Sequence, residues 1–271
     1  MPVTTMPRFG LGTWHMGERP GQRAAEVDAL RYGLDLGVQL IDTAEMYGDG
    51  VAEEIVGQAI AGRRDDVHVV SKCYPQNAGA KSMPQACDRS LKRLRIDRID
   101  CYLLHWRGHI PLIETVATFE RLKQAGKIAS WGVSNFDVED LEELSKVPGG
   151  EHCMTNQVLY SLEERAAEWK VLSLCRARNM TLMAYSPLGQ GDLLTHPELV
   201  ALAEARGMTP AQLALAFVLA QPDVVAIPKS ASRAHVRENV TAQSIVLDDA
   251  TRAALDAVFR PPVGRKHLSL R

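Results

Sequence analysis

The chain has 271 residues, of which 46% are hydrophobic and 24% are charged, an ordinary globular composition. Its formal net charge of −2 gives no reason to expect nucleic acid or a charged membrane surface as a partner. No apolar stretch approaches the length needed to span a membrane, and residues 1–5 lack the basic and apolar regions of a signal peptide.

Short apolar, β-rich runs alternate with amphipathic segments along the whole chain. Eight of these runs are expected to be strands, and in chain order they are residues 9–12, 38–41, 67–72, 99–104, 129–133, 153–157, 181–185 and 224–227. Their nearly continuous apolar character is typical of parallel strands that are buried on both faces.

The segments between these runs carry helix signals. Residues 27–34 repeat apolar side chains at helical spacing, and Gly37 follows as a stop. Thr209 and Gln212 form a capping-box pair around Pro210, which favours a helix start there.

Eight β/α units predict one (β/α)8 barrel domain over residues 1–271, an α/β fold with short rim loops and a C-terminal tail. A doubly wound open sheet shows the same local pattern and is the alternative. The barrel is favoured because candidate functional residues recur at strand ends throughout the chain. A barrel assembles its site from many strands at its C-terminal rim.

The cysteines indicate a reducing compartment. Their number is odd and no two form a C-x-x-C pair, so neither a disulfide framework nor a zinc site is indicated. The five are Cys73, Cys87, Cys101, Cys153 and Cys175. We therefore expect a cytoplasmic protein without a bound metal.

Four residues at or just after the ends of successive strands carry the strongest functional signal: Asp42, Tyr47, Lys72 and His105. A carbonyl that receives a hydride develops negative charge, which needs a proton or a positive field. Tyr47 can donate the proton, and Lys72, held by Asp42, is expected to lower the phenol's pKa from about 10. Each residue alone is more simply explained by packing or ion pairing, but their joint placement favours catalysis.

The glycines do not indicate a Rossmann nucleotide site. Residues 10–15 begin like G-x-G-x-x-G, but His15 stands where the third glycine would be and a loop follows. Barrels can instead bind phosphate at the loops after strands seven and eight. Residues 186–191 offer hydroxyl and backbone donors for a pyrophosphate, and Lys229 with Ser230 suits a ribose 2′-phosphate.

Eight short motifs, in order and spanning nearly the whole chain, resemble those of the aldo/keto reductases. They are Gly10–Trp14, Asp42–Gly48, Val70–Lys72, Leu103–Trp106, Trp131–Phe136, Thr155–Gln157, Ala184–Gly189 and Ile227–Ser230. Any one motif would be a weak signal, and together they are highly specific. The chain looks most similar to short bacterial members that reduce methylglyoxal and similar small aldehydes.

The resemblance implies a role for each site residue. Tyr47 would be the general acid, Lys72 and Asp42 the pair that tunes it, and His105 the group that orients the substrate. The implied cofactor-binding residues are Gly12, Thr13, Ser134, Asn135, Gln157, Tyr185, Ser186, Leu188, Lys229, Ser230, His235, Glu238 and Asn239. Ser134, Asn135 and Gln157 would hold the nicotinamide carboxamide. Tyr185 would stack on the nicotinamide ring, and Glu238 and Asn239 would reach the adenine.

One position departs from the family pattern. Many members have an arginine six residues after the position of Lys229, where this chain has His235 between Arg233 and Arg237. A neutral imidazole is a weaker phosphate partner than a guanidinium. We therefore expect NADPH to be preferred, with NADH as the alternative cofactor.

The expected function is NADPH-dependent reduction of small aldehydes and 2-oxoaldehydes by a monomer. Trp14, Met46 and Trp106 flank the site residues and are expected to wall an apolar substrate pocket, with His15 and His109 at its mouth. Because the rim loops are short, we expect an open pocket that tolerates many small substrates.

Two other functions share these features. Lys72 would be the nucleophile of a Schiff-base lyase or aldolase on the same barrel, although Asp42 would oppose the lowered pKa that such a lysine needs. A dinucleotide-binding regulatory subunit, of a kind that the family also contains, would show no turnover.

Overall fold

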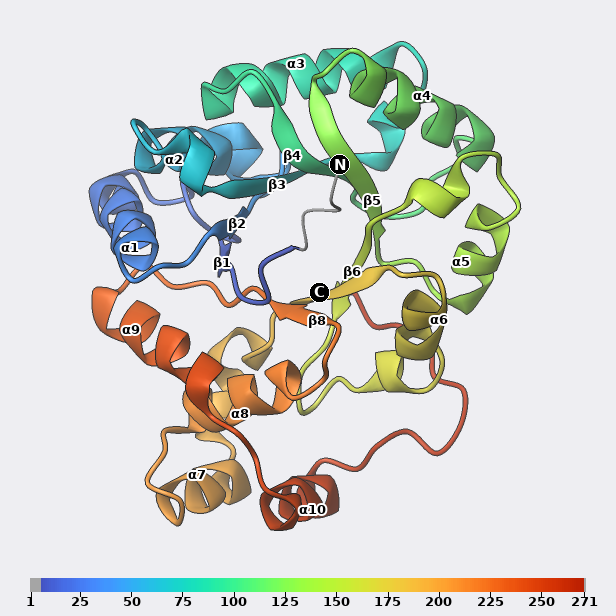
Figure 1. Ribbon diagram of the computed structural model, residues 1–271. Helices are drawn as coiled ribbons and strands as arrows, with labels where there is room; N and C mark the ends of the chain where they lie inside the picture. Colours follow the sequence, from blue (N-terminus) through green and yellow to red (C-terminus); the bar gives the residue numbers. More distant parts are fainter. Residues whose placement is uncertain (1–5, 271) are drawn as a thin grey trace.

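The computed structural model describes residues 6–270 and has a parallel β-barrel at its centre (Figure 1). Each strand pairs with the next one in the chain, and every pairing is parallel. The strands are β1 Leu11–Gly12, β2 Leu40–Asp42, β3 His68–Cys73, β4 Ile99–Leu104, β5 Ile128–Ser134, β6 Thr155–Leu159, β7 Thr181–Tyr185 and β8 Val224–Ala226. Residues 1–5, for which no signal peptide is expected, lie outside the described range, as does Arg271.

Contacts between the first and last strands close the sheet. Parallel bridges join Phe9 to Ala226 and Gly12 to Lys229. The amide of Gly12 donates to Pro228 O at 3.0 Å. A Cβ on Gly12 would lie 2.7 Å from the backbone oxygen of the residue before this proline, so only glycine permits the approach. The (β/α)8 barrel is therefore confirmed, and the open doubly wound sheet is wrong.

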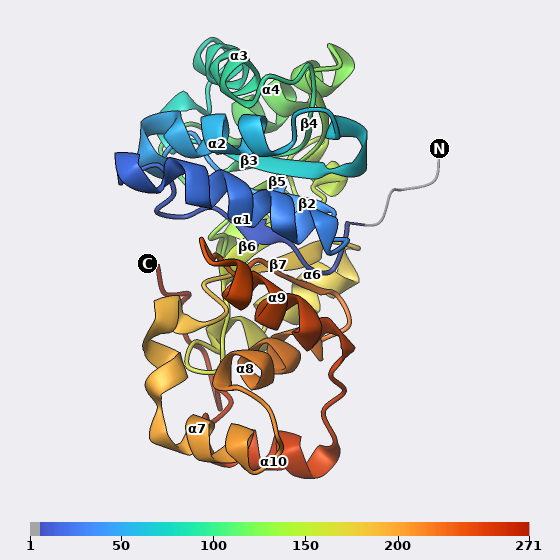
Figure 2. The same cartoon turned by 90° about the vertical axis from the view of Figure 1, so that its left-hand side faces the viewer.

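Helices form the outer layer around the barrel (Figures 1 and 2). Within residues 6–270 they are α1 Arg23–Asp35, α2 Val51–Ala59, α3 Ser82–Leu94, α4 Leu112–Gln124, α5 Val138–Leu144, α6 Val171–Ala177, α7 Pro197–Glu204, α8 Pro210–Leu219, α9 Arg233–Thr241 and α10 Asp249–Val258. The expected capping box at the start of α8 is present: Thr209 and Gln212 each bond the other's backbone amide through their side chains, at 3.2 and 3.1 Å. No helix within the described range is long and apolar enough to cross a membrane.

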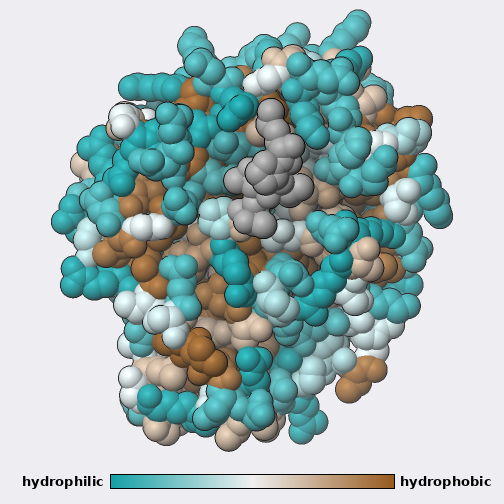
Figure 3. All heavy atoms as spheres, viewed as in Figure 1, coloured by the Kyte–Doolittle hydropathy of each residue, from teal (hydrophilic) through white to brown (hydrophobic). Residues whose placement is uncertain are grey.

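The strands are buried on both faces. Along β4, Cys101 and Leu103 belong to the apolar cluster inside the barrel, whereas Tyr102 and Leu104 pack in the layer between the barrel and the helices. This alternation explains why the strands are apolar at nearly every position. On the outside, hydrophilic side chains cover most of the face seen in Figure 3, with hydrophobic side chains in separate patches.

Candidate active site

The four predicted catalytic residues meet at the carboxyl ends of neighbouring strands. Asp42 is the last residue of β2, Lys72 is the next to last of β3, and His105 follows β4 directly. Tyr47 opens the short 3-10 turn that follows β2. Because these strands are parallel neighbours, their ends share one rim of the barrel, and the side chains come into direct contact.

Lys72 is at the centre of this cluster and is fully buried. Its Nζ donates to Asp42 Oδ2 at 2.7 Å, to Thr43 O at 2.8 Å and to Tyr47 Oη at 3.1 Å. These acceptors use all three N–H bonds of an ammonium group. Since the Tyr47 oxygen accepts from Lys72, its own proton is free to point toward another acceptor.

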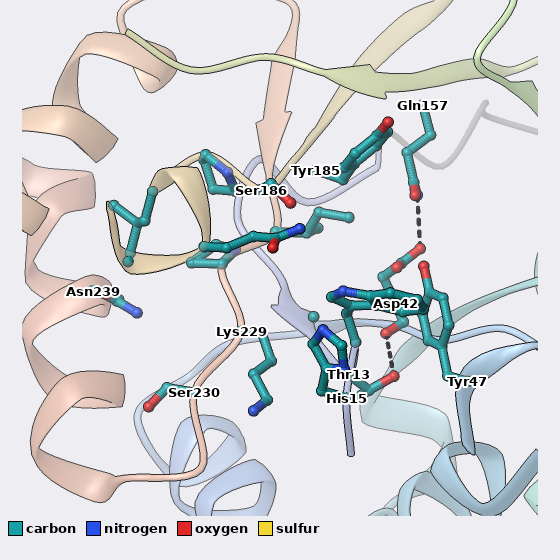
Figure 4. A pocket seen from close by; sticks show the side chains of 18 of the residues that line it. Thr13, His15, Asp42, Tyr47, Gln157, Tyr185, Ser186, Lys229, Ser230 and Asn239 are labelled. Carbon is teal, nitrogen blue, oxygen red and sulfur yellow. Dashed lines mark hydrogen bonds between the residues drawn. The ribbon is translucent and has the colours of Figure 1, made fainter. Parts of the chain in front are cut away.

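Two opposing effects, burial and mutual attraction, act on the charges of the buried pair Asp42 and Lys72. Burial raises the pKa of Asp42 and lowers the pKa of Lys72, and the attraction between the two groups opposes both shifts. Gln157 Nε2 also donates to Asp42 Oδ1 at 2.7 Å, and Thr13 Oγ1 donates to the backbone oxygen of Asp42 at 2.9 Å (Figure 4). With both carboxylate oxygens bonded, the pair is held in one geometry as an ion pair.

Burial raises the pKa of Tyr47 well above its ordinary value, and the Asp42 carboxylate adds to the shift. The net shift is therefore upward, and the expectation of a pKa below the ordinary value of about 10 is wrong. The physical reason is that burial disfavours the charged phenolate and outweighs the Lys72 ammonium, whose field is partly offset by the Asp42 carboxylate 2.7 Å away. Tyr47 is thus protonated at neutral pH, which is the state that a proton donor needs.

His105 is neutral at working pH. Burial and the positive charge of Lys72 hold its pKa well below the usual value for histidine. Its ring meets that of Tyr47 edge-on, with 5.8 Å between the centroids. Nδ1 is buried and has no hydrogen-bond partner among the described residues, and His105 lines the cavity. A neutral imidazole so placed can donate a hydrogen bond without competing for the reacting proton.

The cluster lies at one end of a cavity of about 890 Å³. Figure 4 shows Lys229 and Ser230 on the opposite side of this cavity from Asp42 and Tyr47. Lys72 is fully buried and does not line the cavity. The predicted residues that do line it are Gly12, Thr13, Trp14, Asp42, Met46, Tyr47, His105, Trp106, Ser134, Asn135, Gln157, Tyr185, Ser186, Leu188, Lys229, Ser230, His235, Glu238 and Asn239.

A polar network joins the ends of β5, β6 and β7. Asn135 Nδ2 donates to His105 O and to Ser134 Oγ, both at 3.1 Å. Tyr185 Oη donates to Asn135 Oδ1 at 3.1 Å, and Ser134 Oγ donates to Gln157 O at 2.8 Å. The Gln157 amide nitrogen is bonded to Asp42, whereas its Oε1 accepts nothing from the described residues. That oxygen can accept from an amide such as a carboxamide.

Four residues around the cavity have left-handed backbone conformations. They are His15, Asn135, Ser186 and Gln190, with φ of 63°, 60°, 47° and 59°. Such conformations are uncommon outside glycine and cost on the order of 1–3 kcal/mol each, although asparagine tolerates them better than most residues. Their concentration around one cavity supports its assignment as the functional site.

Two loops fit the phosphate groups of a dinucleotide. In the loop after β7, Gly191 has φ of 107° and nothing lies within 4 Å of a Cβ built on it, so the backbone borders open space at the cavity. After β8, Lys229 is exposed, and its side chain forms no ion pair with the described residues. Ser230 Oγ accepts from Ser232 N at 3.0 Å, which fixes the entry to α9. An unpaired ammonium, a hydroxyl and an uncrowded backbone suit an anionic ligand.

Aromatic side chains wall the catalytic end of the cavity. The Trp14 ring meets Tyr47 edge-on at 4.9 Å, and the Trp106 ring is tilted against His105 at 4.9 Å. His15 lines the cavity, and its Nδ1 lies 2.8 Å from a Glu18 carboxylate oxygen. His109 is exposed and does not line the cavity, so the expectation that it lies at the mouth is wrong.

Several lining residues are not predicted from the sequence, among them Leu194, Pro210, Ala211 and Leu270. Pro210 and Ala211 lie at a clearly predicted helix start, but that pattern does not indicate what the end of the helix faces. Leu270 belongs to the C-terminal tail, and no local pattern shows that the tail returns to the rim.

Residues 8–260 match the aldo/keto reductase family. The chain belongs to the aldo/keto reductases. It is therefore an oxidoreductase with the barrel and the strand-end site described above, and the eight sequence motifs that resemble this family are explained by membership in it.

The similarity to individual members covers nearly the whole chain. Methylglyoxal reductase YeaE of Escherichia coli is 46% identical over 98% of this chain and 95% of its own length. The NADH-specific methylglyoxal reductase of Escherichia coli is 33% identical over 91% of this chain and 92% of its own length. The crystal structure of an aldo/keto reductase from Klebsiella pneumoniae in complex with NADP and acetate has a TM-score of 0.96, at 51% identity, and covers 98% of this chain and 96% of that chain.

The structure argues against the Schiff-base alternative. A nucleophilic lysine must reach the substrate and lose its proton. Lys72 does not line the cavity, and its three donors are used by Asp42, Thr43 and Tyr47.

Proposed function

We propose that this aldo/keto reductase uses NADPH to reduce small aldehydes and 2-oxoaldehydes, such as methylglyoxal, to alcohols. One observation carries the proposal: Tyr47 Oη lies 3.1 Å from Lys72 Nζ at one end of a cavity of about 890 Å³, and Lys229 lines the opposite side. A proton donor and a phosphate-binding cation on opposite sides of one cavity suit a dinucleotide-dependent reductase. The relatives named for methylglyoxal and the complex with NADP support the same substrate and cofactor.

The catalytic residues act on the carbonyl oxygen. When bound, the reduced nicotinamide supplies the hydride. Tyr47 donates its free proton to the oxygen as negative charge develops there, and Lys72 stabilises the resulting phenolate through the same 3.1 Å contact. His105 donates a hydrogen bond that orients the carbonyl. Asp42 holds Lys72 in place.

The residues around the rest of the cavity bind the cofactor. Gln157 Oε1, with Ser134 and Asn135 beside it, takes the nicotinamide carboxamide, and Tyr185 stacks on the ring. The loop after β7 takes the pyrophosphate. On the side of the cavity opposite the catalytic cluster, the adenosine 2′-phosphate and the adenine are bound by five residues: Lys229, Ser230, His235, Glu238 and Asn239. The NADH-specific relative makes NADH the natural alternative cofactor.

Small aldehydes are expected to be better substrates than bulky ketones. Trp14, Met46 and Trp106 wall the catalytic end, and the chain after His105 reaches helix α4 by Leu112, so the rim adds few contacts for a large ligand. NADPH oxidation measured over a panel of aldehydes, methylglyoxal and steroid ketones tests this expectation. We expect high KM values, broad tolerance and the best kcat/KM with small or aromatic aldehydes. A steroid ketone with far higher kcat/KM than every small aldehyde would contradict the substrate class, and no turnover at all would favour a regulatory subunit.

Replacing Lys229 by methionine is expected to weaken NADPH binding by roughly tenfold, because one charged hydrogen bond to the 2′-phosphate is lost. NADH lacks this phosphate, so its affinity is expected to change little. Dissociation constants from fluorescence titration measure both. Lys123→Met, on the exposed end of α4 and outside the cavity, is the matched control. An equal loss for both cofactors would show that Lys229 does not read the 2′-phosphate.

We also propose a monomeric, cytoplasmic protein whose single domain extends over residues 1–271. All five cysteines are buried and free, which suits a reducing compartment. The exposed large hydrophobic residues of the described chain are scattered rather than contiguous in sequence, at Leu36, Ile113, Val246, Val263 and Leu270. Size-exclusion chromatography tests the monomer: elution at twice the monomer mass would contradict it.

A further inference from the structure

Helix α9 is fastened to helix α1 by two arginines, and the two helices lie side by side in Figures 1 and 2. Arg233 holds Asp28 with two parallel hydrogen bonds, Nε to Oδ2 at 2.6 Å and Nη2 to Oδ1 at 2.7 Å. Arg237 Nε donates to Tyr32 Oη at 2.6 Å. Both guanidinium groups also lie over the Tyr32 ring, 5.0 and 5.5 Å from its centroid. We refer to Asp28, Tyr32, Arg233 and Arg237 as the α1–α9 clamp.

The clamp and the cofactor cavity use different faces of α9. Arg233 and Arg237 are four residues apart, so they share the face toward α1. His235, Glu238 and Asn239, also at helical spacing, line the cavity, whereas neither arginine does. The two guanidinium groups that flank His235 in sequence are therefore held away from the adenosine end of the site.

Without the clamp, the first arginine is well placed to reach that end. Side chains on a helix lean toward its N-terminus, and the N-terminus of α9 is where Lys229 and Ser230 enter. Arg233 is the first residue of the helix, so no preceding helical turn restricts it. The hydrogen bonds from Arg233 also keep the pKa of Asp28 below its usual value, so the carboxylate is charged and neutralises the guanidinium.

We propose that the α1–α9 clamp sets the cofactor preference of the enzyme: Asp28 and Tyr32 keep both arginines off the ribose 2′-phosphate and leave Lys229 as the cation that distinguishes NADPH from NADH. This inference rests on the proposed function, because it assumes a dinucleotide in the cavity. It makes two residues outside the pocket determinants of specificity, and it predicts a moderate native preference for NADPH.

Asp28→Ala tests the clamp directly. The released Arg233, with one uncompensated positive charge at the start of α9, is expected to raise the ratio of the NADH to the NADPH dissociation constant by up to about fivefold, the range of an exposed charged pair. The gain is expected to fall as salt is added, because exposed charges are screened. Quenching of the fluorescence of Trp14 and Trp106, which line the cavity, gives both constants without turnover.

Two further variants show whether the gain comes from Arg233. Arg233→Ala alone is expected to leave the native ratio unchanged, since the clamped side chain does not touch the cofactor. The double variant Asp28→Ala/Arg233→Ala is expected to lose the gain of Asp28→Ala. Asp223→Ala is the matched control, because it breaks an exposed ion pair with Arg176, at 3.0 Å, that lies outside the cavity.

Four results would overturn the inference. Equal weakening of NADPH and NADH by Asp28→Ala would show that the clamp only supports the helix. A large loss of NADPH affinity in Arg233→Ala alone would show that this arginine already binds the phosphate. A native protein that binds neither dinucleotide would refute the proposed function together with the clamp, whereas native binding with an unchanged ratio in Asp28→Ala would refute the clamp alone.

Discussion

Replacing Tyr47 by phenylalanine is expected to lower kcat for aldehyde reduction by roughly 10²–10⁴-fold, the usual contribution of a general acid. The phenylalanine ring keeps the edge-on contact with Trp14 at 4.9 Å, so the pocket wall is preserved. Lys72 keeps Asp42 and Thr43 as acceptors, at 2.7 and 2.8 Å. The proton donor is thus the main loss, and the dissociation constant for NADPH is expected to change little.

A second tyrosine provides the matched control for this variant. Tyr102, in β4, is fully buried, and its hydroxyl has no hydrogen-bond partner among the described residues. Tyr102→Phe also removes one buried phenolic oxygen and is expected to leave kcat at the native level. Steady-state kinetics and NADPH titration of both variants separate chemistry from binding. A near-native kcat in Tyr47→Phe would remove Tyr47 from its role as the acid.

The strand pattern could be predicted from the sequence, and the strand ends less well. Apolar runs predict β4 and β7 residue for residue, at Ile99–Leu104 and Thr181–Tyr185. The predicted second strand starts two residues early because the amide of Val38 bonds to Gly33 O at the end of α1 and not to the sheet. A run of apolar side chains does not reveal which backbone groups pair with a neighbouring strand.

The strand order predicted from the sequence explains why the predicted catalytic residues lie together. A parallel order of strands sends every carboxyl end to one rim, so residues at strand ends become neighbours whatever their separation in the chain. Gln157 and Asp42, which are 115 residues apart, bond at 2.7 Å for this reason. The C-terminal tail follows no such rule, which is why Leu270 at the cavity could not be anticipated.

The pKa shift of Tyr47 and the partners of the long side chains are the features that the sequence predicts least well. The sequence places Lys72 near Tyr47, but only the structure shows that burial outweighs the ammonium and raises the pKa of the phenol. In the same way, the sequence shows Arg233 and Arg237 beside His235 without showing that both turn toward α1. The direction of a long side chain depends on partners distant in the chain, and local patterns do not contain it.

The buried ion pair is expected to show the largest effect on stability. Asp42→Asn removes the charge that compensates Lys72, whose side chain is fully buried, while it keeps the size of the residue. Leaving one charge of a buried pair uncompensated costs about 3–5 kcal/mol of unfolding free energy. Urea-induced unfolding followed by circular dichroism measures this loss. Lys72→Met is expected to be destabilising as well, because it leaves the carboxylate uncompensated.

The double variant and the pH dependence distinguish charge from packing in this effect. Asp42→Asn/Lys72→Met has no uncompensated charge and is expected to be more stable than Asp42→Asn alone. In Asp42→Asn, burial without a counter-charge depresses the pKa of Lys72 in the folded state below its unfolded value of about 10.4. Between these two pKa values the unfolded variant binds more protons than the folded variant, so its free energy of unfolding rises with pH. The difference in stability between Asp42→Asn and the native protein is therefore expected to shrink as the pH rises toward about 10. A loss that stays constant with pH, or a double variant no more stable than Asp42→Asn, would show that the pair contributes through packing and hydrogen bonds rather than through charge.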